Sequence, residues 1–242
     1  MSAELNLFPR VMSLAVHELR TPVTVVSGYL RMLLRDQAGP LNDKQRKMIE
    51  EADRSCTRIG ALVTEMSELG KLESDMLTLS GPEFDLCSLM AEVASGMPEG
   101  DDRGITLETR GTDRPVMVAG DRPRLAAVLR ALMHAAIRER ADSGVIVVEC
   151  STFTESNHAW AIIAIGAEPD VRALADAGRA GQAAFDEWRG GLGLALPVGR
   201  RVVEAHGGAL WSSPGDTPRS GSAIRLPIGS RVPKDPPHAT KG

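Results

Sequence analysis

A run of six residues near the start of the chain, HELRTP at positions 17–22, brings together groups that can do chemistry. A neutral imidazole such as that of His17 is a good nucleophile at physiological pH. The carboxylate of Glu18 can accept the proton of the other ring nitrogen and orient the ring. Thr21 follows His17 by four residues, so in a helix the two side chains share one face. We therefore predict a nucleophilic histidine with an acidic partner and a hydroxyl one turn away.

The residues around this run predict a long helix that packs in a bundle. Apolar side chains recur at alternating spacings of three and four, the heptad pattern of packed helices. The stripe consists of Met12, Ala15, Leu19, Pro22, Val26, Tyr29 and Leu33. It places His17 and Thr21 on the solvent-facing side of a helix expected over about residues 5–36. Pro22 should bend this helix just past the histidine.

A second helix is expected to begin after Asn42, which forms a capping box with Gln45. Its own heptad stripe consists of Ile49, Ala52, Cys56, Ile59, Val63 and Met66. Two antiparallel helices with one apolar stripe each cannot close a core alone. Pairing with a second copy into a four-helix bundle is therefore expected. The alternative is that both stripes pack on the C-terminal part of the chain.

The run at 17–22 resembles the phosphoacceptor box of the sensor histidine kinases of two-component systems. The resemblance implies that His17 is phosphorylated and passes the phosphate to an aspartate of a response regulator. It also implies that Thr21 helps to position water that dephosphorylates the regulator. Glu18 completes the catalytic set. The likeness extends over about residues 3–228 and implies an α+β fold: a helical hairpin forming a dimeric four-helix bundle, then an α/β sandwich of the histidine-kinase ATPase type.

The expected domains are a dimerisation and phosphoacceptor hairpin at 1–78, a catalytic, ATP-binding-like domain at 79–230, and a disordered tail at 231–242. The tail is rich in proline and charge, which argues against a packed structure. In the second domain, strands are predicted at 105–109, 116–119, 145–150, 160–165 and 221–227. Helices are predicted at 86–94 and 122–140, and from the glycine-rich run at 190–196 to about residue 205.

A glycine-rich turn that opens a helix can hold phosphates, because backbone donors approach closely and the helix N-terminus favours negative charge. The run at 191–195 resembles the last glycine box of the family. It implies nucleotide contacts from Gly191, Leu192, Gly193 and Leu194. The segment 168–187 occupies the place of the flexible lid over the nucleotide, and Phe185 keeps the lid's aromatic anchor.

Two other parts of this nucleotide site depart from the family pattern. Ala131 and Ala135 stand where the family has asparagines, the second of which binds magnesium. Alanine offers no oxygen ligand, so no metal ligand set is predicted, although Arg138 matches a basic residue that could meet a phosphate. Ala164 replaces the aspartate that bonds the adenine amino group, and of the two glycines that follow it in the family only Gly166 remains. Binding of ATP and Mg²⁺ is therefore expected to be weak or lost.

The composition and charge of the chain argue against several classes of protein. The 242 residues are 43% hydrophobic, enough for a packed core, and the formal net charge is -4 without a basic run. Nucleic acid and anionic membrane surfaces are therefore not expected partners. Three isolated cysteines indicate reduced thiols and a cytoplasmic location. No run approaches the ~20 apolar residues of a membrane span, and the N-terminus lacks a signal peptide. The chain then either has no sensor of its own or is part of a longer one.

We interpret the sequence as a cytoplasmic protein-histidine kinase of a phosphorelay. As a homodimer it would autophosphorylate on His17 with ATP and transfer the phosphate to the receiver domain of a response regulator. The alternative is a pseudokinase, or a histidine phosphotransfer or phosphatase protein, that docks a regulator without using ATP efficiently. A third interpretation is a scaffold that binds a regulator, a separate sensor protein or another kinase. Nucleotide binding separates the first from the others, and acceptance of phosphate from a regulator separates the second from the third.

Overall fold

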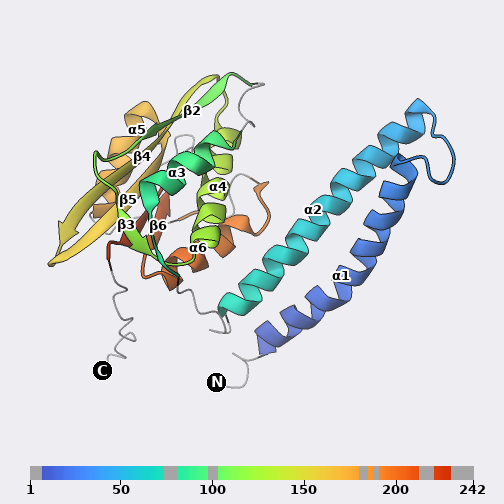
Figure 1. Cartoon of the computed structure of the whole chain (residues 1–242), viewed down its shortest axis with the longest axis horizontal. Helices are drawn as coiled ribbons and strands as arrows, with labels where there is room; N and C mark the ends of the chain where they lie inside the picture. Colours follow the sequence, from blue (N-terminus) through green and yellow to red (C-terminus); the bar gives the residue numbers. More distant parts are fainter. Residues whose placement is uncertain are drawn as a thin grey trace. The chain divides into compact units, whose positions relative to one another are not determined.

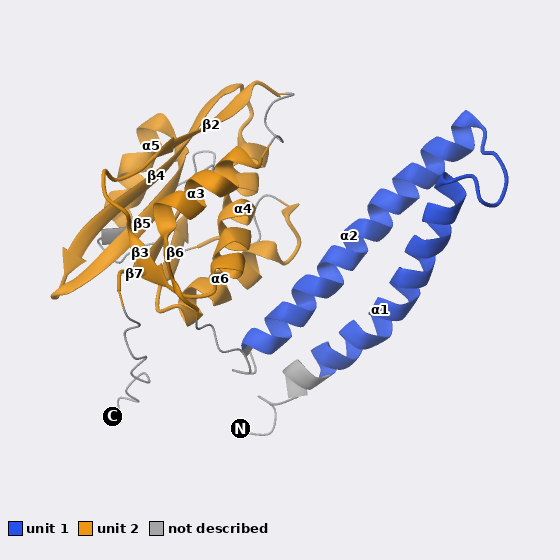
Figure 2. Cartoon of the chain, viewed as in Figure 1, with its two compact units in different colours: residues 1–77 blue, residues 78–242 orange. Residues whose placement is uncertain are grey.

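The structure, a computed structural model, describes residues 7–73, 81–97, 103–179, 185–187, 191–212 and 221–229. The chain divides into two compact units, Met1–Leu77 and Thr78–Gly242 (Figure 2). The predicted tail at 231–242 lies outside the described residues. Within the described part of the chain, no helix is both long enough and apolar enough to cross a membrane.

Unit 1 is a hairpin of two long helices, α1 (Leu7–Leu34) and α2 (Asp43–Glu73), which lie side by side (Figure 1). The helix α1 stays helical through Pro22. Proline has no backbone donor for the carbonyl of Glu18, which loosens the helix at this point. Figure 1 shows the ribbon of α1 changing direction along its length, as expected for a helix with an internal proline.

The loop of the hairpin is held by side chains at both helix ends. Asn42 and Gln45 exchange two bonds of 2.9 and 3.0 Å between side chain and backbone, which confirms the predicted capping box. Arg46 donates to the carbonyl of Leu34 at 3.0 Å and to both carboxylate oxygens of Asp36 at 2.7 and 2.9 Å. The start of α2 thereby satisfies a free carbonyl at the end of α1.

The two helices of the hairpin meet along a stripe that differs from the predicted one. The Cys56 thiol lies 3.2 Å from the Ser27 hydroxyl and 3.6 Å from the Val23 carbonyl. Val16 and Val63 are each 4% exposed. Only part of the predicted α1 stripe faces α2, because the row that contacts α2 includes a polar residue, Ser27, that a hydrophobic pattern passes over. Several of those residues face away from α2: the exposed fractions are 43% for Leu19, 48% for Val26 and 63% for Tyr29.

Unit 2 is built on a five-stranded sheet with strand order β2-β4-β5-β7-β6. Strand β2 is parallel to β4, and the other neighbours are antiparallel. A separate pair, β1-β3, is antiparallel. The strands are β1 (Glu83–Asp85), β2 (Ile105–Arg110), β3 (Met117–Ala119), β4 (Gly144–Glu155), β5 (His158–Ala167), β6 (Ala209–Ser212) and β7 (Ser222–Pro227). The five predicted strand segments all carry strands, and the predicted α/β sandwich is confirmed.

Helices cover both faces of this sheet (Figure 1). They are α3 (Leu86–Ser95), α4 (Arg122–Glu139), α5 (Glu168–Arg179) and α6 (Ala195–Ala205). The helices α3, α4 and α6 form one layer, while α5 packs on β4, β5 and β7 from the other side. Side chains alternate between faces along a strand, so Ile162 and Ala164 of β5 point to α5, and Ile163 and Ile165 point to the three-helix layer.

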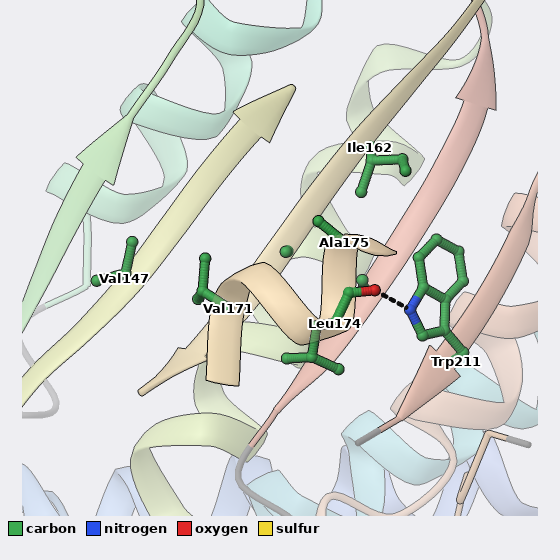
Figure 3. Packing of buried hydrophobic residues seen from close by; sticks show 8 residues of the cluster. Val147, Ile162, Val171, Leu174, Ala175 and Trp211 are labelled. Carbon is green, nitrogen blue, oxygen red and sulfur yellow. Dashed lines mark hydrogen bonds between the residues drawn. The ribbon is translucent and has the colours of Figure 1, made fainter. Parts of the chain in front are cut away.

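The helix α5 corrects one sequence interpretation. Residues 168–187 were expected to form a flexible lid over a nucleotide. Instead, residues 168–179 form a helix whose Val171, Leu174 and Ala175 are buried in an apolar cluster on the outer face of the sheet (Figure 3). The indole Nε1 of Trp211 donates to the carbonyl of Leu174 at 2.7 Å. Three apolar residues at helical spacing, together with this bond, fix α5 on the sheet.

Candidate functional site

The first candidate site is the exposed surface of α1 around His17. The His17 side chain is 80% exposed and that of Glu18 is 72% exposed. The ring Nδ1 lies 3.5 Å from Glu18 Oε1. A carboxylate on the Nδ1 side favours the tautomer with the proton on Nδ1, which leaves the lone pair of Nε2 available as a nucleophile. Thr21 is exposed as well, so solvent and a docking protein can reach all three side chains.

The surface beside this histidine is rich in apolar side chains. The exposed large apolar residues of the hairpin are Val11, Leu14, Leu19, Val25, Val26, Tyr29, Met32, Met48 and Ile59. These residues lie on both helices, and most of the α1 members flank the HELRTP run. A soluble monomer rarely exposes so many apolar side chains on one small unit, and such surfaces mark sites of protein association.

The second candidate site is the glycine turn at the start of α6, in unit 2. Gly191 and Gly193 have φ angles of +59° and +66°, a region that L side chains rarely adopt. The helix begins without a side-chain hydrogen bond from its N-cap residue, Leu194. Backbone donors at such a start are suited to an anion. Arg138 of α4 donates to the Gly191 carbonyl at 3.1 Å, so the structure brings together the predicted Arg138 and the predicted glycine turn.

The face of α4 that would hold the metal is apolar. Ala135 is fully buried, and Ala131 is partly exposed. Neither side chain carries an oxygen atom, and His134 already has an interaction partner. Among the described residues, no three histidine, cysteine or acidic side chains gather where they could hold a metal ion. The arrangement of α4 therefore does not fit a bound Mg²⁺.

The end of β5 carries no group that could recognise adenine. A side chain at Gly166 would meet Leu174 of α5 at 3.2 Å and Gly221 at 3.4 Å, so this glycine makes room for α5. Ala164 points to the same outer face. The structure thus separates both predicted positions from the glycine turn, which lies on the three-helix side. The next carboxylate along the chain, Glu168, is held by Arg110 at 2.7 and 2.8 Å.

Two buried hydroxyls on the three-helix side were not singled out from the sequence. Ser222 is 0% exposed, and its hydroxyl has no hydrogen-bond partner in the described structure. It pairs in register with Ile165 and Ser212. The Ser212 hydroxyl accepts a bond from the Asp186 amide at 3.3 Å, which places Phe185, the next residue back, close to the end of β6. A serine in a strand gives no signal in the sequence that it will be buried without a partner.

The residues present fit a nucleotide only in part. The glycine turn, Arg138 and the free hydroxyl of Ser222 offer contacts for an anion or a polar ring edge. The magnesium ligand and the carboxylate for adenine are both missing. Hydrogen bonds that involve charged groups contribute about 1.5–3 kcal/mol each, so their loss leaves a site that does not fit tightly bound Mg²⁺–ATP.

Comparison with known proteins agrees with the hairpin and the sandwich. Residues 10–75 match the His Kinase A (phospho-acceptor) domain. The chain is 29% identical over 202 residues to the signal transduction histidine-protein kinase BarA of Escherichia coli (strain K12), covering 80% of this chain and 22% of BarA. It is 24% identical over 221 residues to the sensor protein GacS of Pseudomonas syringae pv. syringae, covering 87% of this chain and 24% of GacS. The chain thus spans less than a quarter of these relatives.

Solved structures share the fold. The full-length ShkA structure in complex with AMPPNP superposes with a TM-score of 0.69 at 20% identity, covering 94% of this chain and 48% of ShkA. The histidine kinase AdeS of Acinetobacter baumannii gives a TM-score of 0.52 at 23% identity, covering 88% of this chain and 97% of AdeS. The chain belongs to the histidine kinase family of two-component systems. Its phosphoacceptor domain is of a type that implies dimerisation.

Proposed function

We propose that this protein carries a phosphoryl group on His17 and exchanges it with an aspartate of a response-regulator receiver domain. The observation that carries the proposal is the exposed imidazole of His17, with Glu18 Oε1 3.5 Å from Nδ1, inside a phosphoacceptor domain. In the exchange, Nε2 attacks the phosphorus of an aspartyl phosphate. The bond from phosphorus to the aspartate oxygen breaks, and the carboxylate leaves. Transfer to a regulator is the reverse reaction.

Glu18 and Thr21 have separate roles in this proposal. Glu18 accepts the Nδ1 proton as positive charge develops on the ring, which stabilises the phosphorylated imidazole. Thr21, one helical turn away on the same face, positions a water molecule that hydrolyses the phosphorylated regulator. The acceptor and the hydrolytic functions therefore share one surface of α1.

The residues of unit 2 support a phosphoryl donor for His17 that is a different protein, not ATP bound to this chain. The absence of oxygen ligands at Ala131 and Ala135 and the packing of Ala164 against α5 favour a chain that receives its phosphate from a regulator or another kinase. A second candidate is ATP-dependent autophosphorylation on His17. The glycine turn with Arg138 at 3.1 Å favours it, and BarA bears the name of a histidine-protein kinase.

The exposed apolar surface of the hairpin supports assembly as a homodimer. Apolar residues on the outer surface of the hairpin, such as Tyr29 of α1 and Ile59 of α2, are 63% and 47% exposed in the single chain. A second copy would cover them in a four-helix bundle. The proposal places this dimer in the cytoplasm, where it acts between a separate sensor or kinase and a response regulator.

The test uses the full-length chain with two labelled donors in parallel. One arm offers a panel of receiver domains carrying labelled aspartyl phosphate, and the other offers labelled ATP with Mg²⁺. We expect label on His17, labile in acid and stable in base, from a receiver domain and little or none from ATP. Rapid labelling from ATP alone would establish the second candidate. No label from either donor would contradict both.

A further inference from the structure

Two cysteines that are far apart in the sequence meet where α3 packs on the sheet. Cys87 is the second residue of α3, and its amide donates to the side chain of Asp85, the N-cap residue, at 3.1 Å. Cys150 lies in β4 and is 2% exposed. Neither is in a disulfide in this structure. The sequence gives no hint of this proximity, because it depends on how α3 crosses the sheet.

A glycine beside Cys150 lets Cys87 approach. Strand β2 pairs with β4 in parallel up to Arg110 opposite Glu149, so the following residues, Gly111 and Cys150, are neighbours in register. A Cβ atom built on Gly111 would lie 3.9 Å from Cys87 Cβ and 4.0 Å from its Sγ. Neighbouring residues in a ladder point to the same face. The Cys150 side chain therefore emerges from the sheet next to the space that Cys87 occupies.

The two thiols have different surroundings. Burial, and then the neighbouring Cys87, raises the pKa of the Cys150 thiol well above its usual range, so Cys150 stays protonated and is a poor first target for an oxidant. Cys87 is partly exposed, and its Sγ lies 3.9 Å from the hydroxyl of Thr112. A small oxidant can therefore reach Cys87 before it reaches Cys150.

We propose that Cys87 and Cys150 form a peroxide-sensitive thiol pair that closes to a disulfide bond between α3 and β4. In the first step the Cys87 sulfur attacks one oxygen of a hydroperoxide, the O–O bond breaks, and Cys87 becomes a sulfenic acid while water or an alcohol leaves. In the second step the Cys150 sulfur attacks the Cys87 sulfur. The S–O bond breaks, and the departing hydroxide takes the Cys150 proton as water. Each hydroperoxide accepts two electrons.

This disulfide bond would stabilise unit 2, whereas His17 lies in unit 1 and would keep its surroundings. It would close a long loop, and such loops gain the most from a cross-link. It would also fix the first turn of α3 against β4. We expect the melting temperature of the oxidised chain to rise by about 5–10 °C, and a thiol reductant to reverse the rise.

The experiment exposes the full chain to hydrogen peroxide, quenches with a thiol-alkylating reagent in denaturant, and counts free thiols. The chain has three cysteines; the oxidised form should keep only Cys56 free, with peptide mapping linking Cys87 to Cys150. Cys56→Ser is the matched control, because that cysteine is buried in the hairpin of unit 1. It should still form the bond and retain no free thiol.

Three further variants, at Cys150 and Cys87, separate the two steps. In Cys150→Ala the sulfenic acid on Cys87 has no partner, so it should persist and be captured by dimedone; Cys150→Ser should behave in the same way. In Cys87→Ser neither the adduct nor the bond should form. The proposal is overturned if all thiols survive peroxide, if Cys87 is oxidised to sulfonic acid while Cys150 remains free, or if the bond joins Cys56 or a second molecule.

Discussion

The indole nitrogen of Trp211 donates a hydrogen bond of 2.7 Å to the backbone carbonyl of Leu174, and this bond joins β6 to α5 across the outer face of the sheet (Figure 3). Both residues are at least 97% buried, since Trp211 is 3% exposed and Leu174 is 1% exposed. A bond between groups so well shielded from water is costly to leave unmade. It holds residues 168–179 on the side of the sheet away from the glycine turn.

Trp211→Phe should therefore loosen α5. The aromatic ring remains, but the Leu174 carbonyl loses its donor, which should lower the free energy of unfolding by about 1–3 kcal/mol. Hydrogen exchange of amides in residues 168–179 should accelerate more than exchange in α4. Trp160→Phe is the matched control: Trp160 contacts the Arg225 guanidinium through its ring face, 4.8 Å from the centroid, and phenylalanine keeps a ring there. Equal acceleration in both variants would show that the bond is not what holds α5.

The attachment of α5 should also weaken in acid. Arg110 donates to both carboxylate oxygens of Glu168 and holds the pKa of Glu168 below its usual range. A depressed pKa in the folded state means that the pair stabilises the fold above the unfolded pKa of about 4.3. This stabilisation is lost as pH falls through the lower, folded value. Melting followed from neutral to acid pH should show this loss, and Glu168→Gln should remove that part of the pH dependence.

Salt and a neighbouring acid provide the controls for that measurement. The pair lies on the surface, so its effect should shrink as ionic strength rises. Asp170→Asn removes an acid from the same first turn of α5 and should retain the pH dependence. An unchanged profile in Glu168→Gln would rule out this pair as its source.

The positions of the helices and strands could be predicted from the sequence better than the side on which each helix packs. The strands, the capping box of Asn42 and Gln45, and the exposure of His17 follow from local patterns, and the structure has them. The face of α1 that contacts α2 was not predicted, because it includes Ser27, a partly buried polar residue that a hydrophobic pattern leaves out. Residues 168–179 were expected to be part of a flexible lid and instead form α5, because the three apolar residues that attach it to the sheet, Val171, Leu174 and Ala175, give only a weak pattern in the sequence. The meeting of Cys87 with Cys150 depends on tertiary packing alone.

The phosphoacceptor can be tested without disturbing the fold. His17 is exposed, so His17→Gln should abolish acid-labile, base-stable label while changing the free energy of unfolding by less than about 0.5 kcal/mol. Glu18→Gln should slow labelling because the ring loses its proton acceptor. Thr21→Ala should reduce only dephosphorylation of a cognate regulator. Label that survives in His17→Gln would place the phosphate on another residue.

Substitutions on different faces of α2 should distinguish the stability of the dimer from the stability of the hairpin. Ile59 is 47% exposed in the single chain, so Ile59→Glu should leave the hairpin helical while a buried, unpaired carboxylate weakens the dimer at least about tenfold, or about 1.4 kcal/mol. Thr57→Glu adds the same charge at another exposed position of α2 and should have little effect. Val63→Glu should unfold the hairpin, because Val63 is 4% exposed. Sedimentation and circular dichroism measure the two properties, and an unaffected dimer in Ile59→Glu would place the interface elsewhere.

Restoring the missing nucleotide ligands should destabilise the protein. From the sequence alone, the double variant Ala135→Asn, Ala164→Asp would be expected to bind ATP more strongly. In the structure Ala164 is packed against the apolar cluster under α5, so an aspartate there buries an unpaired charge and should cost about 3 kcal/mol or more. Ala135→Asn places an amide in a fully buried position and should cost about 1–3 kcal/mol.

Ala131→Asn is the matched control for that pair, because Ala131 is one turn earlier on α4 and partly exposed; it should change stability by less than about 0.5 kcal/mol. Urea unfolding measures these costs, and calorimetry with a non-hydrolysable ATP analogue measures binding with and without Mg²⁺. We expect poor affinity, little Mg²⁺ dependence, and no gain from the double variant. A stable double variant that binds the analogue tightly and with Mg²⁺ would contradict the assignment of Ala135 and Ala164 to buried positions outside a nucleotide site.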